Sequence, residues 1–290
     1  MPFTPDTRVL LTGAGAQLGG AIVARLSPVC RLVPLTRHEL DVTSPTAVDA
    51  AVRDAAPDVV VNCASFNDVD GAEREAAAAL EVNGLAVGHL ADACARRGAR
   101  LVHYSTDFVF DPAEDPGLLD ESSPVSPRSV YAQSKLLGEI LARRAPRHWI
   151  FRVASLFGGG RAKSSLDRIA TTLIDGGTVR AFSNRTVTPS YVIDLADALA
   201  AALAHDVPAG LYHCVNTGKA TWIEVARALA TDLGRDPDTA VQPSTFDPSA
   251  FPARRPTFAA MSNAALAAHG VVLPAWQDAI ARYAAVRRRG

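Results

Sequence analysis

The chain has 290 residues, of which 48% are hydrophobic and 20% are charged, enough for one large domain or one domain with a small lobe. Lys and Arg number 29 against 30 Asp and Glu, a net charge of -1, so charge gives no reason to expect nucleic-acid or anionic-membrane binding. The start of the chain lacks a signal-peptide pattern, and no apolar run is long enough to span a bilayer. These features predict a cytoplasmic protein.

Strand and helix patterns alternate through the first half of the chain. Short β-branched runs predict strands, and longer segments with apolar residues three or four apart predict helices. The alternation predicts an α/β fold, a Rossmann-type doubly wound parallel sheet over residues 1–155, with ligands bound beyond the carboxyl ends of its strands. The predicted strands are Arg8–Leu11, Arg31–Leu35, Asp58–Val61, Arg100–Tyr104 and Trp149–Val153; the predicted helices are Gln17–Leu26, Pro45–Ala55, Gly71–Arg96 and Ser129–Arg144.

This alternation stops after about residue 155. The glycines at 158–160 begin a loop, and prolines interrupt the stretch from 237 to 256. Helices are expected over Tyr191–Ala204, Thr221–Leu233 and Ala275–Ala285. We expect residues 156–290 to form a smaller C-terminal substrate-binding lobe, interleaved with the last strands of the sheet.

The four cysteines, Cys30, Cys63, Cys94 and Cys214, lie far apart and form no CxxC spacing. This usage predicts reduced core thiols, with neither a metal site nor a disulfide framework.

A glycine-rich turn follows the first predicted strand and leads into the first predicted helix. Such a turn lets the backbone approach a pyrophosphate, which binds the free N–H groups at the start of the helix. Its place in a βαβ unit favours a dinucleotide site, although a merely tight turn is the alternative. The residues assigned to this part of the site are Gly13, Gly15, Ala16, Gln17 and Leu18.

The end of the second strand bears on the choice of cofactor. Thr36 offers no carboxylate for an adenosine ribose, and Arg37 could pair with a 2′-phosphate, so NADPH is favoured, with NADH possible. An exposed Arg37 without a ligand is the alternative. Asp41 and Val42 could flank the adenine, although Asp41 could equally cap the next helix. Cys63 and Ala64 end the third strand near the pyrophosphate and ribose.

Tyr131 and Lys135 are four residues apart on a predicted helix and therefore share one face. An ammonium in this position lowers the pKa of a phenol, which can then exchange a proton with a carbonyl or an alcohol near neutral pH. Thr106, at the end of the fourth strand, could hold the same oxygen. Only three of the 29 basic residues are lysines, which makes an ordinary surface pair the weaker alternative.

By these residues the chain resembles the extended short-chain dehydrogenases/reductases and, more narrowly, the dTDP-4-dehydrorhamnose reductase family. The resemblance covers nearly the whole chain, and its most diagnostic segments are 103–111 and 253–256. The other matching segments are 57–62, 69–73, 82–83, 188–191, 194–196 and 273–276.

The resemblance implies reduction of the 4-keto group of a nucleotide-activated 6-deoxy sugar by NAD(P)H. Tyr131 would be the general acid, Thr106 would bind the substrate carbonyl, and Lys135 would hold the nicotinamide ribose. The remaining residues assigned to the cofactor are Ser65, Asn83 and Ser105. Asp107 and Val109 would bind substrate, and Arg255 would reach its diphosphate.

The resemblance also bears on assembly and metal binding. A homodimer is common among relatives of this kind. Ala21 stands where some members carry an acidic ligand at a dimer contact, so we expect no magnesium site.

The chain departs from the family pattern near the sugar. The differing segments are 65–67, 155–157 and Asn184-Arg185, the last standing where Asp-Gln is common. They leave open whether the product is dTDP-L-rhamnose or that of a 4-ketoreductase acting on another deoxysugar nucleotide.

The sequence disfavours two other functions. A dehydratase is disfavoured because Phe108, not Glu, follows Asp107. A non-catalytic NADP-binding regulatory subunit, resembling that of methionine adenosyltransferase, is disfavoured because Thr106, Tyr131 and Lys135 are all present.

Overall fold

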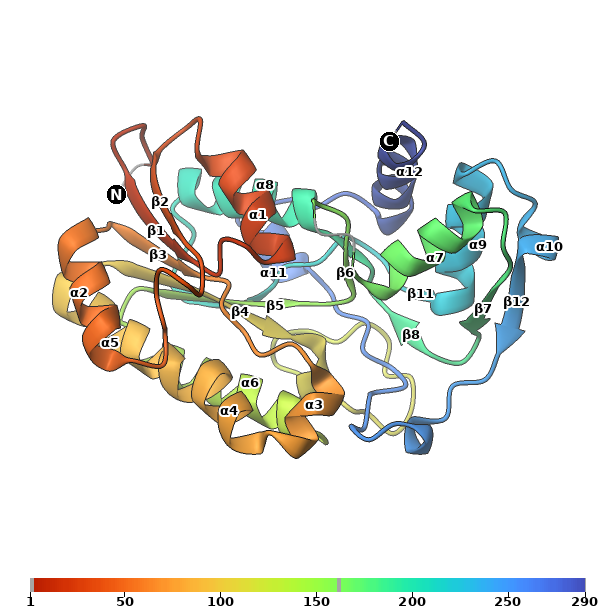
Figure 1. Ribbon diagram of the computed structural model, residues 1–290, viewed down its shortest axis with the longest axis horizontal. Helices are drawn as coiled ribbons and strands as arrows, with labels where there is room; N and C mark the ends of the chain where they lie inside the picture. Colours follow the sequence, from red (N-terminus) through yellow and green to blue (C-terminus); the bar gives the residue numbers. More distant parts are fainter. Residues whose placement is uncertain (1–2, 161–162, 290) are drawn as a thin grey trace.

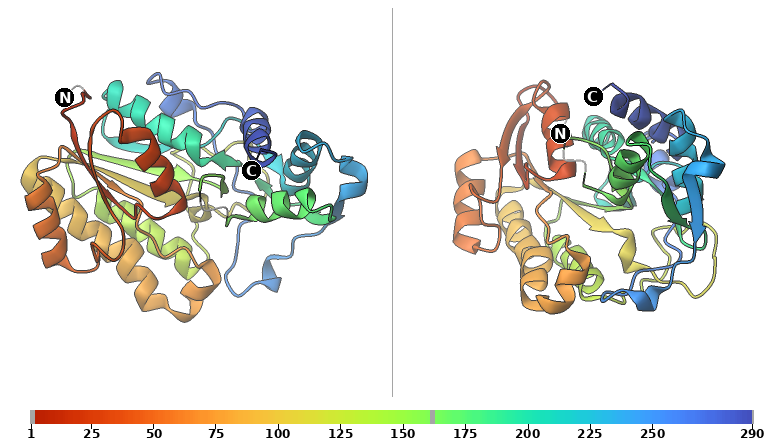
Figure 2. Two further views of the ribbon diagram at one scale, coloured as in Figure 1. Left: turned by 45° about the horizontal axis from the view of Figure 1, so that its top comes forward. Right: turned by 45° about the vertical axis from the view of Figure 1, so that its right-hand side comes forward.

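A computed structural model describes residues 3–160 and 163–289. Figures 1 and 2 show a larger lobe, in which helices cover both faces of a sheet, beside a smaller lobe built mainly from the last third of the chain. Both lobes have their own apolar clusters of buried side chains. In the part of the chain that the structure describes, no helix is long and apolar enough to cross a membrane.

The central sheet has six parallel strands in the order β10-β5-β4-β3-β1-β2. The chain runs outward from β1 to β2 and then crosses back to β3, so the strand order reverses between β1 and β3. In sheets of this kind the crevice beyond that reversal is the usual ligand site. The strands are β1 Arg8–Thr12, β2 Arg31–Leu35, β3 Val59–Asn62, β4 Arg100–Thr106, β5 His148–Val153 and β10 Gly210–His213.

Successive side chains of the buried strands point to opposite faces, so each face has its own core. Val9 and Leu11 of β1 pack with α1 and α8, whereas Leu10 between them packs with α2 and α5. The helices are α1 Gln17–Leu26, α8 Val192–Ala204, α2 Pro45–Ala55, α5 Ala86–Arg97 and α6 Val130–Ala142. This architecture confirms the predicted α/β doubly wound fold.

The smaller lobe is a separate layered unit. Strand β7 (Val179–Phe182) pairs in parallel with β12 (Val241–Ser244), and α7 (Ser165–Ile174), α9 (Trp222–Asp232) and α12 (Trp276–Arg287) contribute to its core. Its short elements are β6 Leu156–Phe157, β8 Thr186–Val187, β9 Ser190–Tyr191, β11 Ala220–Thr221 and α10 Pro237–Ala240. The short helix α11 (Ala264–Ala267) instead packs against β10 and the core of the larger lobe. Between β9 and β11 the chain returns to the larger lobe, where α8 packs on the central sheet and β10 pairs with β5.

Most predicted elements are confirmed to within two residues, including α8, α9 and α12. Strand β10 is not predicted by the sequence, because Gly210–His213 is a short run without a clear alternating pattern. The structure leaves all four cysteines free, although Cys30 and Cys63 are only partly buried.

The single helix predicted over Gly71–Arg96 is wrong. The segment divides into α3 (Val69–Arg74), α4 (Ala76–Leu80), a π-helical turn (Glu81–Leu85) and α5. Glu75 leaves the helical region, with φ -118° and ψ 46°. The π turn brings Gly84 so close to α6 that a Cβ there would lie 2.5 Å from Cδ2 of Leu137. Turns of this kind often occur at functional sites.

Candidate active site

A cavity of about 610 Å³ opens at the carboxyl ends of β1, β2 and β3. Its walls come from the three segments that follow these strands, as expected for the strand-order reversal between β1 and β3. The predicted cofactor residues that line it are Gly13, Gly15, Ala16, Arg37, Asp41, Val42, Cys63, Ala64 and Ser65.

The turn after β1 has the geometry that a pyrophosphate requires. Gly13 has φ +69°, and a Cβ on it would lie only 2.6 Å from the main-chain nitrogen of Ala64. The first intrahelical hydrogen bond of α1 runs from Gly20 N to Ala16 O at 2.8 Å, which leaves the N–H groups of residues 17–19 directed beyond the helix start. The Ala16 side chain does not cap this helix, so the helix start suits an anion.

Gln17 and Leu18 therefore contribute to this site through their main chains. The Gln17 side-chain amide donates to the carbonyl of Gly158 at 2.7 Å and to Asp167 Oδ2 at 3.2 Å. Leu18 is buried in the core under α1. The Gln17 side chain thus links the turn to the smaller lobe.

Arg37 is exposed at the cavity wall. The two carboxylates near it in the chain, Glu39 and Asp41, accept hydrogen bonds from threonines instead of from Arg37. Glu39 accepts hydrogen bonds of 2.8 Å from both the main-chain N–H and the hydroxyl of Thr36. Bonds from Thr43 lower the pKa of Asp41, and the charge of Arg37 lowers it further. No ion pair engages Arg37 within residues 3–160 and 163–289, so its guanidinium is available to a phosphate.

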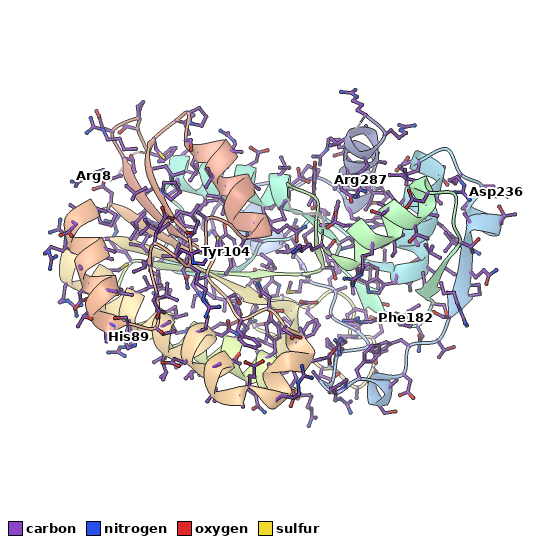
Figure 3. All side chains as sticks on the ribbon, viewed as in Figure 1. Arg8, His89, Tyr104, Phe182, Asp236 and Arg287 are labelled. Atoms are coloured by element: carbon purple, nitrogen blue, oxygen red, sulfur yellow. The ribbon has the colours of Figure 1, made fainter. Side chains whose placement is uncertain are left out.

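The three predicted catalytic residues converge at the end of β4. Thr106 is its last residue, and α6 begins at the cap Ser129, whose hydroxyl accepts from Ala132 N at 3.2 Å. Tyr131 and Lys135 lie one helical turn apart and are both buried. The Lys135 ammonium donates to the main-chain carbonyl of Tyr104 at 2.6 Å; Figure 3 labels Tyr104 in the middle of the molecule.

Burial controls the pKa values of this group. It raises the pKa of Tyr131 to about 12, opposed by a hydrogen bond with Thr106. It also lowers the pKa of Lys135 to about 8, opposed by the nearby Glu139 carboxylate. The prediction that Lys135 lowers the pKa of Tyr131 is therefore wrong for this structure: burial of the phenol raises that pKa, Thr106 rather than Lys135 opposes the rise, and the ammonium bonds to Tyr104.

A buried ion pair supports the same strand and helix. Arg152 of β5 donates to both carboxylate oxygens of Glu139, at 2.9 and 2.8 Å, and Ser105 donates to one of them at 2.6 Å. Ser105 thus donates its hydroxyl hydrogen to Glu139, and this hydrogen is not available to the cofactor. The sequence gives no signal for this ion pair, because Glu139 and Arg152 lie on separate elements, α6 and β5, and meet only in the folded chain.

The structure corrects the role expected for Asn83, because its side chain has no hydrogen-bonding capacity left for a cofactor. Its oxygen accepts from the Ser65 hydroxyl and from Phe66 N, both at 2.8 Å. Its amide donates to Phe66 O and to the Ser134 hydroxyl, both at 3.0 Å. Asn83 instead holds the loop after β3 against α6.

The predicted substrate residues have different environments. Asp107 is 2% exposed, and burial raises its pKa to about 6. The substrate contact predicted for the Val109 side chain is corrected, since that side chain is fully buried in an apolar cluster separate from the one containing Tyr131. Arg255 donates two hydrogen bonds to Asp70, at 2.9 and 2.7 Å, so its guanidinium already has a carboxylate partner.

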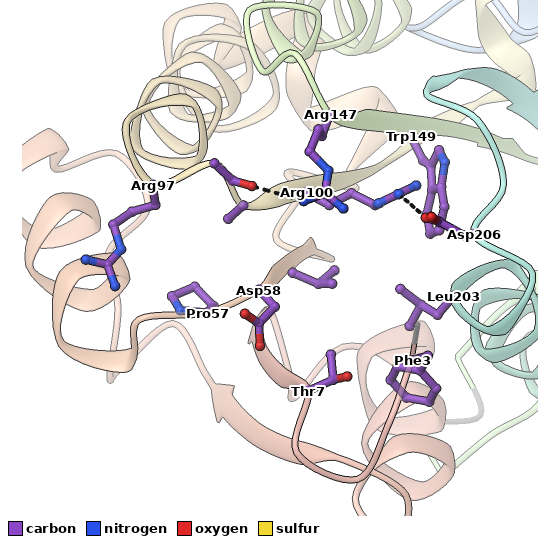
Figure 4. A pocket seen from close by; sticks show the side chains of 13 residues that line it. Phe3, Thr7, Pro57, Asp58, Arg97, Arg100, Arg147, Trp149, Leu203 and Asp206 are labelled. Atoms are coloured by element: carbon purple, nitrogen blue, oxygen red, sulfur yellow. Dashed lines mark hydrogen bonds and ion pairs between the residues drawn. The ribbon is translucent and has the colours of Figure 1, made fainter. Parts of the chain in front are cut away.

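A second cavity, of about 200 Å³, lies at the opposite edge of the sheet among the amino ends of β3, β4 and β5 (Figure 4). Arg100 there donates to Asp206 at 2.6 Å and to Val207 O at 2.9 Å, and stacks 3.9 Å above the ring of Trp149. These contacts join β4 and β5 to the end of α8, which is a structural role.

Similarity to known proteins agrees with this site. The model of the RmlD substrate binding domain family matches residues 7–288. The chain is 37% identical over 280 residues to a dTDP-4-dehydrorhamnose reductase of Mycobacterium tuberculosis, covering 94% of this chain and 91% of that protein. It is 38% identical over 284 residues to the Streptomyces griseus enzyme of the same name, covering 95% and 92%.

A solved structure supports the fold of both lobes. The chain superposes on the dTDP-4-dehydrorhamnose reductase of Bacillus anthracis in complex with NADP with a TM-score of 0.89 and 26% identity, covering 96% of this chain and 98% of that one. The match of the family model and of these relatives spans the glycine turn, the Tyr131–Lys135 pair and the smaller lobe alike. The chain therefore belongs to the dTDP-4-dehydrorhamnose reductase family.

Proposed function

We propose that this protein is an NADPH-dependent reductase of the 4-keto group of a nucleotide-activated 6-deoxy sugar, with dTDP-4-dehydrorhamnose as substrate and dTDP-L-rhamnose as product. The observation that carries the proposal is the convergence of Thr106, Tyr131 and Lys135 at the end of β4, in the same sheet whose strands β1 to β3 end at a cavity of about 610 Å³. Family membership narrows the carbonyl substrate to a sugar nucleotide.

The cofactor would lie along the carboxyl ends of β1 to β4. The free N–H groups of residues 17–19 would bind its pyrophosphate, and Arg37 would pair with the 2′-phosphate that distinguishes NADPH from NADH. Lys135 would hold the nicotinamide ribose, since its ammonium has donors beyond the one given to Tyr104. When bound, NADPH supplies the hydride that reduces the sugar carbonyl.

Tyr131 would protonate the carbonyl oxygen as negative charge develops on it. Its raised pKa keeps the phenol protonated at neutral pH, so the proton is present when the reaction begins. The Thr106 hydroxyl, at the end of β4, would orient the same oxygen. Phe108 contacts the Tyr131 ring edge-on, with ring centroids 5.7 Å apart, which keeps the phenol in one orientation.

The test is NADPH oxidation, followed by its near-ultraviolet absorbance, with the 4-keto-6-deoxy sugar nucleotide generated in situ from dTDP-glucose. Tyr131→Phe should lower turnover by about 10²- to 10⁴-fold and leave NADPH affinity nearly unchanged. Tyr212→Phe is the matched control, because Tyr212 lies on β10, away from the site, and its hydroxyl donates to Pro208 O.

Full activity of Tyr131→Phe would exclude this phenol as the acid. Tight NADPH binding without turnover would instead favour another sugar nucleotide, or a regulatory subunit that keeps the cofactor site. Identification of the sugar product by NMR would settle the stereochemistry, and the dimer expected from the resemblance stays a prediction.

A further inference from the structure

A third cavity lies in the smaller lobe and is strongly basic. It has a volume of about 350 Å³, and its walls come from α7, β7 and the start of α9. Among the residues that the structure describes, three arginines line it, Arg168, Arg180 and Arg185, and no Asp or Glu does. Phe182, labelled in Figure 3 at the end of β7, and Trp222 provide aromatic surface beside these charges. Such a cavity suits an anion attached to a planar ring.

Arg185 is the partly buried arginine of this cavity, whereas Arg168 and Arg180 are exposed. Its main-chain carbonyl accepts from Trp222 N at 3.2 Å, and its side-chain Nε donates to Pro256 O at 3.2 Å. Its guanidinium lies 4.9 Å from the ring centroid of Phe246 and 5.8 Å from that of Phe108. A guanidinium fixed in this way loses little conformational entropy when it binds a ligand.

The donors of Arg185 remain available. Beyond the bond from Nε, neither terminal nitrogen of Arg185 has a hydrogen-bond partner in the part of the chain that the structure describes. The indole N–H of Trp222, on the same cavity, is also buried without a partner there. Arg255 differs, because Asp70 already occupies both ends of its guanidinium.

Arg185 also connects this cavity to the catalytic residues. Phe108 contacts both the Arg185 guanidinium and the Tyr131 ring. Burial raises the pKa of the Asp107 carboxyl, and the charge of Arg185 partly opposes this rise. In a nucleotide sugar the diphosphate is attached at C1, across the ring from the 4-keto group. A cation one side chain beyond Tyr131 is therefore well placed for the diphosphate when the keto oxygen meets the phenol.

We propose that Arg185 binds the diphosphate of the substrate and makes the enzyme select a nucleoside diphosphate over the corresponding nucleoside. This inference rests on the proposed function, and it assigns to Arg185 the contact that the sequence had suggested for Arg255. Arg185 further offsets the repulsion between the phosphates and the Asp107 carboxylate. The resemblance had suggested Asp-Gln where this chain has Asn184-Arg185, so Arg185 is a departure from that pattern.

The test is isothermal titration of the NADP⁺-loaded protein with thymidine, dTMP and dTDP. Arg185→Gln should weaken dTDP binding by about 10- to 100-fold and leave thymidine binding within about threefold, since only a charge-assisted bond to phosphate is lost. Arg180→Gln is the matched control, because Arg180 lines the same cavity but is exposed on β7. It should change dTDP affinity by less than about threefold.

Arg185→Lys is a second variant in case Arg185→Gln misfolds. It keeps the positive charge and loses only the paired N–H donors of the guanidinium. It should weaken dTDP binding by about 3- to 10-fold, and NADP⁺ binding by each variant reports an intact first lobe. In turnover, Arg185→Gln should raise KM for the sugar nucleotide with little change in kcat.

The outcomes separate this inference from the proposed function. If the wild type binds dTDP but Arg185→Gln weakens thymidine and dTDP equally, or no more than Arg180→Gln does, the role of Arg185 is wrong and the reductase assignment stands. If the wild type binds neither thymidine nor dTMP nor dTDP, both the role of Arg185 and the proposed function fail.

Discussion

The Lys135 ammonium donates a 2.6 Å hydrogen bond to the main-chain carbonyl of Tyr104, in a site where both residues are buried. A buried ammonium with one main-chain acceptor is poorly compensated for the water it has lost. The lowered pKa of Lys135, about 8, expresses this penalty. The catalytic arrangement is therefore obtained at some expense of stability.

Replacement of Lys135 by Met should reveal that penalty. Lys135→Met should raise the free energy of unfolding at pH 7 by about 1–3 kcal/mol, because it removes a buried charge. The same change should lower turnover by about 10²-fold or more. Chemical denaturation and NADPH oxidation measure the two effects. Lys219→Met is the control, since Lys219 is exposed and pairs with the exposed Asp115.

The pH dependence has a definite sign. Between pH 8 and 10.5 the unfolded chain keeps the Lys135 proton while the folded chain has released it. The unfolded state then binds more protons, so the contribution of Lys135 to wild-type stability rises with pH across this window. The stability difference between Lys135→Met and the wild type should therefore shrink over the same range. A difference that stays constant from pH 7 to 10.5 would contradict the lowered pKa of Lys135.

Arg37→Ala should change cofactor preference. Loss of a guanidinium that reads the 2′-phosphate should weaken NADPH binding by about 10- to 100-fold and NADH binding by less than about threefold. Fluorescence titration with both dinucleotides measures this. Arg53→Ala, which removes an exposed arginine paired with Asp54 on α2, should alter neither. Equal weakening of both cofactors by Arg37→Ala would mean that Arg37 does not contact the phosphate.

Asn83→Ala should destabilise the loop after β3. It would leave polar groups of Ser65, Phe66 and Ser134 without their partner, which lowers the free energy of unfolding by about 2–4 kcal/mol. NADPH affinity should fall as well, because this loop forms one wall of the cofactor cavity. Asn67→Ala, in the same loop but exposed, should change stability by less than about 0.5 kcal/mol. Equal stability of the two variants in a urea titration would refute this account.

Two glycine-to-alanine substitutions should change the free energy of unfolding in opposite directions. Gly138→Ala would place a Cβ against the main-chain oxygen of Asn83, whereas the nearest atom to a Cβ on Gly20 lies 3.9 Å away. Gly138→Ala should therefore lower the free energy of unfolding by about 1–3 kcal/mol. Gly20→Ala should raise it by about 0.5–1 kcal/mol through helix propensity. Thermal unfolding of both variants provides the comparison, and stabilisation by Gly138→Ala would show that α6 does not pack closely on the π turn.

The sequence predicted the sheet and its flanking helices because their apolar periodicity is local. It did not predict the division of Gly71–Arg96, because a helical pattern continues through the segment and the break depends on packing against α6. The same limit applies to Asn83. Its presence in the site region was anticipated, but its four hydrogen bonds connect a loop, a π turn and a helix far apart in the chain.

The charged residues show a related contrast. Tyr131 and Lys135 were recognised because both the helix spacing and the scarcity of lysine are visible in the sequence. The pKa of Tyr131 was not, since burial has no sequence signal of its own at a single position. Arg185 stood out as a departure from the family pattern, yet its partners Phe108, Trp222 and Phe246 become neighbours only in the folded chain.

The link made by Gln17 bears on how such enzymes could be recombined. Its amide joins the cofactor turn to Gly158 and to Asp167, and Asp167 in turn accepts from the Tyr283 hydroxyl of α12 at 2.5 Å. A chimera that keeps the first 155 residues and imports the remainder from a relative would carry only one side of this junction. To exchange sugar preference by grafting the second lobe, Gln17 and its acceptors would have to be transferred as one set.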